Sequence, residues 1–210
     1  MSKKFDFPTR VAFYDSVLER AAEIAFALTE AMTLPGRAVL DVGVGEFPSL
    51  WYALMQSGFD ARGIDVIKEY FAKLPAGLRE RLFYDDIVNT RLRPDSFDGV
   101  LCVSTLEHIP DWKQAVLNMR GLCKHLGKLV FTLPFSHSSP CENIKTKGKL
   151  TRVFSFAQVQ MIQRLAGSVV RSETYRCWDG LRWRDGQRLS FPQKDRAVPD
   201  LVCFSCVVKK

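Results

Sequence analysis

A short apolar run in this 210-residue chain ends in an acidic residue and two alternating glycines, in the segment Val39–Gly45. Glycine tolerates positive φ and lets the backbone approach a ligand closely, so Asp41, Gly43 and Gly45 predict a tight turn from a strand into a binding loop. A dinucleotide-binding turn has a further glycine three residues after the second, where this chain has Pro48. The residues therefore predict a phosphate- or nucleoside-binding turn without the nicotinamide dinucleotide fingerprint.

Three later strands are also expected to end in residues that could bind a ligand: Asp65 after the second, Asp86 with Ile87 after the third, and Ser104 after the fourth. The carboxyl ends of parallel strands meet at one edge of an open sheet, so these side chains should lie together. Asp65 is placed to accept both hydroxyls of a ribose, and Asp86 could accept from an adenine amino group. Each residue alone fits a solvated strand end or a helix cap, but together they favour an adenosine ligand.

Apolar periodicity, turn residues and capping residues predict the elements that position these side chains. A helix is expected over about 9–33, with Ala21, Ala25, Leu28 and Met32 on its apolar face. Strands are expected over 39–42, 59–65, 81–84, 98–103, 128–133, 169–175 and 201–208, with Pro134 stopping the fifth. Further helices are expected from Pro48 to Gly58, from Asp111 to Gly127, and from Ser155 to near Gly167.

This alternation predicts an α/β fold with a doubly wound, mostly parallel seven-stranded sheet, helices on both faces and an antiparallel last strand pair. The link between the last two strands is too short and irregular for a crossover helix, which favours the antiparallel arrangement. We expect one domain over 1–210, with basic loops at about 134–154 and 176–199 on the edge of the sheet where the strands end.

Several segments of the chain resemble the class I S-adenosylmethionine-dependent methyltransferases, from about Val39 to Gly167. They are 39–45, 63–66, 85–87, 96–100, 104–109 and 126–130, and the most specific is Phe-Asp-x-Val followed by Leu106–Ile109, Leu-Glu-His-Ile. The likeness is to the small-molecule subgroup, similar to methyltransferase type 11. It implies a Rossmann-like methyltransferase fold, S-adenosylmethionine as cofactor and S-adenosylhomocysteine as product.

The resemblance also implies roles for single residues. The backbone at Gly43 and Gly45, next to Asp41, would approach the methionine part of the cofactor. The ribose would be held by Asp65, beside Val66, and the adenine by Asp86 and Ile87. The Ser104 side chain would line the cofactor near its sulfonium. Tyr14 would cover the methionine carboxylate, or else it is an aromatic residue of the core.

One departure from the family pattern is Phe47, followed by Pro48, where many members have a third alternating glycine. The large side chain and the missing amide change the start of the following helix, where a cofactor carboxylate could find donors. A non-catalytic relative that keeps the fold for binding or assembly is therefore an alternative. An oxidoreductase is less consistent with the glycine pattern.

Methyl transfer from a sulfonium is a direct displacement, so the enzyme must chiefly align the reactants and exclude water. A hydroxyl acceptor would benefit from a general base, and His108, one helical turn beyond Ser104, is the best-placed candidate. The alternative is a structural histidine that fixes the loop. His137, after the fifth strand, is a second candidate on the acceptor side.

The formal net charge of +7 is concentrated in residues 142–196, which hold 12 Lys or Arg and 5 Asp or Glu. Arg152, Trp178 and Arg182, together with His137, are the expected acceptor-binding residues of the two basic loops. Cations interleaved with aromatic rings suit an anionic or saccharide small molecule. RNA or another nucleic acid is the alternative partner, and a solvated basic loop without a ligand is the third interpretation.

The six cysteines lie mostly inside apolar stretches, as expected of reduced, buried thiols in a cytoplasmic protein. Cys203 and Cys206 have the spacing of a metal site but no second pair to complete four ligands, so no metal is expected. No apolar run approaches the roughly 20 residues of a membrane span. The oligomeric state and the acceptor atom stay open.

Overall fold

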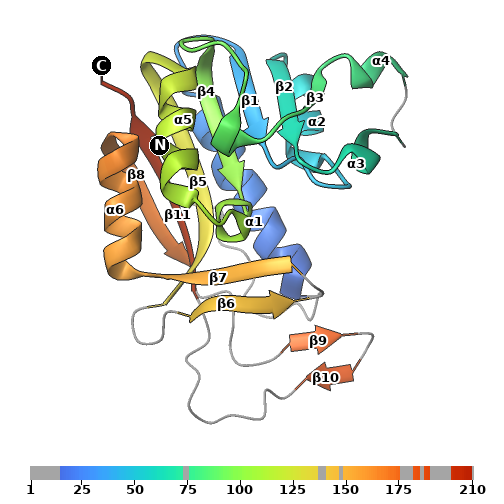
Figure 1. Ribbon diagram of the computed structural model, residues 1–210, viewed down its shortest axis with the longest axis vertical. Coiled ribbons are helices and arrows are strands. Elements are labelled where there is room, and N and C mark those ends of the chain that lie inside the picture. Colours follow the sequence, from blue (N-terminus) through green and yellow to red (C-terminus); the bar gives the residue numbers. More distant parts are fainter. Residues whose placement is uncertain are drawn as a thin grey trace, which may run out of the picture.

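The computed structural model describes residues 15–72, 76–136, 141–146, 149–175, 182–184, 187–189 and 200–209. Seven strands form the main path of the sheet in the order β3-β2-β1-β4-β5-β11-β8 (Figure 1). They are β1 Ala38–Val42, β2 Asp60–Asp65, β3 Leu82–Tyr84, β4 Phe97–Val103, β5 Cys123–Ser136, β8 Ser168–Tyr175 and β11 Asp200–Val207. Strands β1 to β5 run parallel, whereas β11 is antiparallel to both β5 and β8. The expected sheet with its antiparallel last pair is therefore confirmed.

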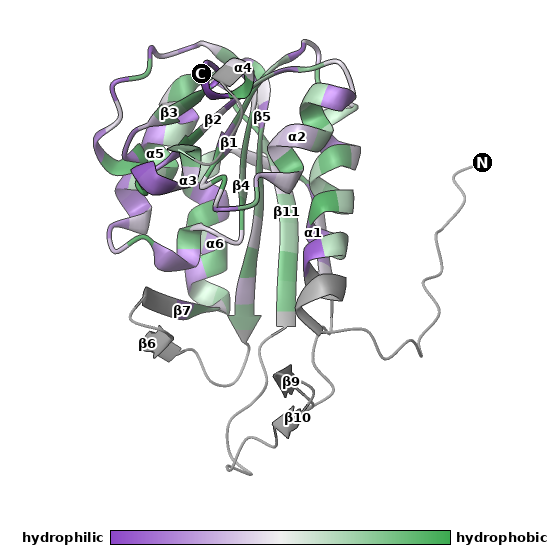
Figure 2. Ribbon diagram, turned by 90° about the vertical axis from the view of Figure 1, so that its right-hand side faces the viewer, coloured by the Kyte–Doolittle hydropathy of each residue, from purple (hydrophilic) through white to green (hydrophobic). Residues whose placement is uncertain are grey.

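Helices cover both faces of this sheet. They are α1 Asp15–Ala31, α2 Ser49–Gln56, α3 Lys68–Ala72, α4 Ala76–Arg79, α5 Trp112–Leu122 and α6 Phe156–Ala166, with the 3-10 turns η1 Ile87–Asn89 and η2 Leu106–His108. Figure 2 shows α1 and α2 on one side of the strands and α5 and α6 on the other. The part of the expected first helix before Asp15 lies outside the described residues. No described helix has the length and hydrophobicity of a membrane span.

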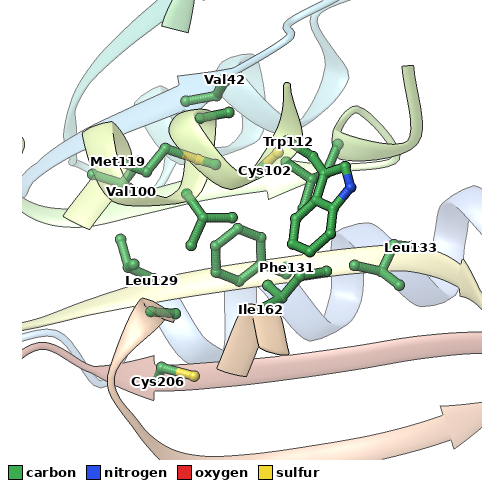
Figure 3. Packing of buried hydrophobic residues seen from close by; sticks show 14 of the residues in the cluster. Val42, Val100, Cys102, Trp112, Met119, Leu129, Phe131, Leu133, Ile162 and Cys206 are labelled. Carbon is green, nitrogen blue, oxygen red and sulfur yellow. The ribbon is translucent and has the colours of Figure 1, made fainter. Parts of the chain in front are cut away.

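Two apolar cores result from the side-chain alternation of the buried strands. Leu40 and Phe131 face the core on the α5 and α6 side, whereas their neighbours Val39 and Val130 face the core under α1 and α2. Figure 3 shows Trp112, Met119 and Ile162 packed around Phe131 in the first core. Because helices cover both faces, the central strands are nearly continuous in hydrophobic residues.

The buried face of α1 differs from the expected one. Glu23, Phe26, Ala27, Glu30 and Ala31 are buried. Ala21, Ala25 and Met32, which were expected to face the core, are exposed, and Leu28 is only partly buried. Two glutamates can lie on the buried face because each has hydrogen-bond partners in the sheet.

The expected boundary between the fifth helix and strand was wrong. Helix α5 ends at Leu122 and β5 begins at once with buried Cys123, which is extended with φ −78 and ψ 135. Gly127 therefore does not cap the helix but lies within β5, where a Cβ would come 2.7 Å from the carbonyl oxygen of Asp98. Strand β5 also continues through Pro134, which is tolerated because the pairing with β4 already ends at Thr132.

Much of the expected 134–154 loop is a strand hairpin. Strand β6, Cys141–Thr146, pairs antiparallel with β7, Lys149–Ser155, and β7 adds to β5 in parallel through the pairs Phe135↔Phe154 and Ser136↔Ser155. The sheet therefore has nine strands rather than seven. The burial of Phe154, edge-to-face with Trp112 at 5.7 Å between ring centroids, stabilises this addition.

In the expected 176–199 loop, β9 Arg182–Arg184 pairs with β10 Gln187–Leu189 in a separate hairpin. The other residues of that loop lie outside the part of the chain that the structure describes. The expected cap of α6 is confirmed, because Ser155 Oγ accepts from Gln158 N and Gln158 Oε1 accepts from Ser155 N.

Candidate cofactor and acceptor site

The turn after β1 uses its two glycines in different ways. Gly43 has φ 79, a conformation that favours glycine. A Cβ at this position would also lie 2.3 Å from Cγ2 and Oγ1 of Thr105, so there is no room for a side chain. Gly45 has φ 69, and a Cβ there would meet nothing within 4 Å. Only Gly45 therefore faces open space at the edge of the sheet, where the backbone can approach a ligand.

Asp65 joins the end of β2 to this turn. Its Oδ2 accepts the backbone N–H of Gly45 at 2.9 Å, and its Oδ1 accepts the N–H of Ile67 at 2.9 Å. A carboxylate oxygen can accept a further hydrogen bond through its second lone pair, so Asp65 can still bind a hydroxyl. The neighbouring Val66 is 56 % exposed. The expected ribose-binding pair therefore lies beside the turn.

Asp41 lies beneath the turn, almost fully buried. Burial raises the pKa of its carboxyl to about 7, although the charge of Arg20 and a hydrogen bond from the Trp51 backbone lower it; the charge of Asp65 also raises it. The structure thus places Asp41 as a support of the turn rather than on its open side.

The segment after β3 is held by its own cap and by helix α5. Asp86 is exposed and caps η1, because its Oδ1 accepts the N–H of Val88 at 2.9 Å. Ile87 is buried. Asn118 of α5 donates to the carbonyls of Ile87 and Val88 at 2.9 and 2.7 Å. The expected adenine-binding segment is thereby attached to α5.

Ser104, at the end of β4, takes the left-handed conformation with φ 44. Its N–H donates to Thr132 Oγ1 at 3.0 Å, and its hydroxyl donates to Glu23 on α1. Glu23 is 1 % exposed. Sequence reasoning missed Glu23; its spacing of three and four residues from Phe26 and Ala27 was the available signal that it shares their face.

His108 lies in η2 at the same edge of the sheet, with its side chain 41 % exposed. Its Nε2 is 3.9 Å from Oε1 of the buried Glu107, and its backbone N–H donates to the Thr105 carbonyl at 2.9 Å. The backbone of His108 is therefore fixed to the end of β4, while its imidazole reaches solvent.

Arg152 is buried at the start of the segment that leads into α6. Its guanidinium donates to the carbonyl of Ile109 at 2.6 Å and to that of Pro110 at 3.4 Å, and lies over the ring of Phe154 at 5.7 Å. It therefore connects β7 to the segment after η2. Of the other expected acceptor-side residues, Arg182 lies in β9. Tyr14, His137 and Trp178 lie outside the described residues.

Residues 40–131, which include the ends of β1, β2, β3 and β4, match a family model described as a methyltransferase domain. This part of the chain is therefore similar to a methyltransferase domain. The ubiquinone biosynthesis O-methyltransferase of Methylococcus capsulatus is 34 % identical over 106 residues, which cover 48 % of this chain and 44 % of that protein. The chain spans about half the length of the curated relatives it matches.

Solved structures share the fold of this chain. The Burkholderia thailandensis 1,6-didemethyltoxoflavin-N1-methyltransferase, solved with its substrate and S-adenosylhomocysteine bound, has a TM-score of 0.63 at 15 % identity, over 98 % of this chain and 93 % of that one. The cyclase SpnF has a TM-score of 0.60 at 21 % identity, over 74 % of this chain and 60 % of that one. The family match and these structures confirm the resemblance to class I methyltransferases and the Rossmann-like fold. The SpnF structure shows that this fold also belongs to a protein named for another reaction.

Proposed function

We propose that this chain is an S-adenosylmethionine-dependent methyltransferase that methylates oxygen or nitrogen of a small, anionic or saccharide acceptor in the cytoplasm. The observation that supports it most is the hydrogen bond between Gly45 and Asp65, because it brings the open turn and the acidic strand end into one site. Both residues lie within the segment that matches the methyltransferase family. The buried thiols of Cys102 and Cys206 support a reducing compartment.

The cofactor would lie across the carboxyl ends of β1 to β4. In this proposal Asp65 and Val66 hold the ribose, Asp86 and Ile87 the adenine, and Gly43, Gly45 and Ser104 the methionine portion, with Tyr14 over its carboxylate and Asp41 supporting the turn. The open space at Gly45 and the exposed Val66 fit a bound nucleoside. When bound, the cofactor supplies an electrophilic methyl group on a sulfonium.

The acceptor would bind between η2 and the basic segment that follows β5. His108 is exposed at this edge and would take the proton of a hydroxyl acceptor. His137, Trp178 and Arg182 would contact the acceptor, whereas the buried Arg152 would act by holding the Ile109 carbonyl and thus the segment after His108. The matched O-methyltransferase of Methylococcus capsulatus supports oxygen as the acceptor atom.

Calorimetric titration with S-adenosylmethionine and S-adenosylhomocysteine tests the cofactor site. We expect binding by the wild type and at least tenfold weaker binding by Asp65→Ala, since the ribose loses its acceptor. Asp60→Ala is the matched control, because Asp60 is a half-exposed carboxylate at the opposite end of the same strand, paired with Arg81. Absence of binding to the wild type would exclude the proposed activity.

A transfer assay with labelled S-adenosylmethionine then distinguishes acceptor classes. Separate pools of carboxylated or phosphorylated small molecules, sugars and RNA are offered, and label incorporation is followed. Incorporation into the small anionic or saccharide pools supports the proposal. Incorporation into RNA alone, with activity that falls steeply with salt, would assign a nucleic-acid substrate instead.

A further inference from the structure

Helix α1 buries two glutamates seven residues apart, Glu23 and Glu30, which are 1 % and 4 % exposed. Glu30 binds Lys128 and Arg171, and it accepts from Ser205 Oγ at 2.8 Å. Those partners lie on β5, β8 and β11, away from the candidate site. Glu23 instead reaches Ser104 at the end of β4, which borders that site, and Thr132 on the neighbouring strand β5.

Glu23 belongs to a closed network of hydrogen bonds. Its Oε1 accepts from Thr132 Oγ1 at 2.8 Å and also from the Ser104 hydroxyl. Thr132 Oγ1 in turn accepts the Ser104 N–H at 3.0 Å. On the other side of the carboxylate, Arg20 Nη1 lies 3.5 Å from Oε2. Both the backbone and the hydroxyl of Ser104 are therefore fixed by the same pair of residues.

The direction of these hydrogen bonds determines what Ser104 can offer a ligand. A carboxylate only accepts, so the Ser104 proton points toward Glu23, and the lone pairs of Ser104 Oγ can accept from other partners. A serine with φ 44 also needs surroundings that hold it in this conformation. The Glu23–Thr132 pair supplies that constraint at the point where β4 ends.

We propose that Glu23 is a positioning residue that holds Ser104 as a hydrogen-bond acceptor for an N–H or O–H group of the bound ligand. The inference rests on the proposed function, because it takes Ser104 to line the cofactor site. It deepens that function by assigning a role to a residue of α1, which lies outside the segment 40–131 that matches the family.

The test compares binding of S-adenosylhomocysteine, measured by calorimetry, for Glu23→Met, Glu23→Gln and the matched control Glu30→Met. Methionine keeps the volume but removes the acceptor, so we expect about tenfold weaker binding. Glutamine keeps one oxygen for Ser104 and Thr132 and should restore binding to within about threefold of the wild type. Glu30→Met should lower the melting temperature but leave the affinity unchanged.

A double-mutant cycle separates positioning from general structural support. Ser104→Ala should weaken binding as Glu23→Met does. The double variant should bind no more weakly than either single variant, because the two changes remove the same interaction. Should Glu23→Met fail to fold, Thr132→Val, which removes only the bridging hydroxyl, is expected to weaken binding severalfold.

If the wild type binds S-adenosylhomocysteine and folded Glu23→Met, or Thr132→Val, binds it with the same affinity, the inference is overturned. The proposed function would still stand. Additive losses in the double variant, or an equal loss in Glu30→Met, would also overturn the inference. Absence of binding to the wild type would overturn both proposals together.

Discussion

The backbone N–H of Gly45 donates to the carboxylate of Asp65 at 2.9 Å, which ties the turn after β1 to the end of β2. The two residues are far apart in the chain but adjacent in the sheet, because β1 and β2 pair in parallel. A ligand that binds Asp65 therefore lies beside the open backbone of Gly45.

The two glycines of the turn should differ in their tolerance of alanine. Gly45→Ala should cost about 1–2 kcal/mol in unfolding free energy, because only its positive φ is unfavourable for alanine. Gly43→Ala should cost about 1–3 kcal/mol more, since its methyl group would overlap Thr105. Urea unfolding measures both, and adding Thr105→Gly should recover part of the loss at Gly43 only. Equal losses in the two variants would contradict the contact with Thr105.

Asp41 should make stability depend on pH. The pKa of this carboxyl is higher in the folded protein, at about 7, than its usual value of 3.8, so the native state binds the proton more tightly. The stabilisation of the folded state by the protonated Asp41 carboxyl is fully present below about pH 4 and is lost as the pH rises through 7.

Asp41→Asn removes this titration and can still accept from the Trp51 N–H. The unfolding free energy of the variant minus that of the wild type should rise between about pH 4 and 7, by at most on the order of 4 kcal/mol. Above about pH 8 this difference should stay constant. Urea unfolding at several pH values measures the difference. Asp60→Asn, at a half-exposed site on β2, is the control for replacing an aspartate by asparagine. A pH-independent difference for Asp41→Asn would show that the carboxyl titrates normally.

Arg152 should stabilise the segment after η2. Arg152→Met removes the donors to the Ile109 and Pro110 carbonyls, and we expect a loss of about 2–3 kcal/mol in unfolding free energy. Arg152→Lys should recover little, because an ammonium lacks the planar fork of the guanidinium. Arg164→Met, at an exposed position of α6, is the control and should change stability by less than about 0.5 kcal/mol. A stable Arg152→Met variant would show that these hydrogen bonds contribute little.

His108 should matter for transfer to a hydroxyl acceptor and not for cofactor binding. His108→Gln should lower kcat about 100-fold or more, because the acceptor proton has no base, while the affinity for S-adenosylhomocysteine stays unchanged. The measurement uses the acceptor pool that shows activity with the wild type. Full activity in the variant would show that the imidazole of His108 is not the base.

The strand-end residues were predictable because strand, turn and helix signals are local in the sequence. Asp65 and Ser104 lie at the ends of strands with a clear pattern, and Asp86 follows a strand with a weaker one. Parallel pairing then places all three on one edge. The buried face of α1 was not predictable from apolar residues alone, although the spacing of Glu23 from Phe26 and Ala27 was compatible with it. Ala21 and Ala25 fit either environment, and Glu23 can be buried only because Ser104 and Thr132 meet it.

The β6–β7 hairpin was not predicted because it, too, depends on contacts between residues far apart in the chain. Its sequence is rich in lysine, with Lys145 and Lys149 at strand positions, and such residues are uncommon in strands. Its place in the sheet depends on Phe154, whose burial against Trp112 joins residues far apart in the chain. The continuation of β5 through Pro134 similarly depends on its pairing with β11, which extends to Phe135.

The attachment of β7 to β5 through only two residue pairs has an evolutionary consequence. Changes in the length or sequence of β6 and the start of β7 leave the register of β1, β4 and β11 untouched. Related chains could therefore diverge in this hairpin while their cofactor-side framework stays the same. The segment between Phe135 and Phe154 could therefore be exchanged between such relatives, and we expect the exchange to transfer the preference for an acceptor from one chain to the other.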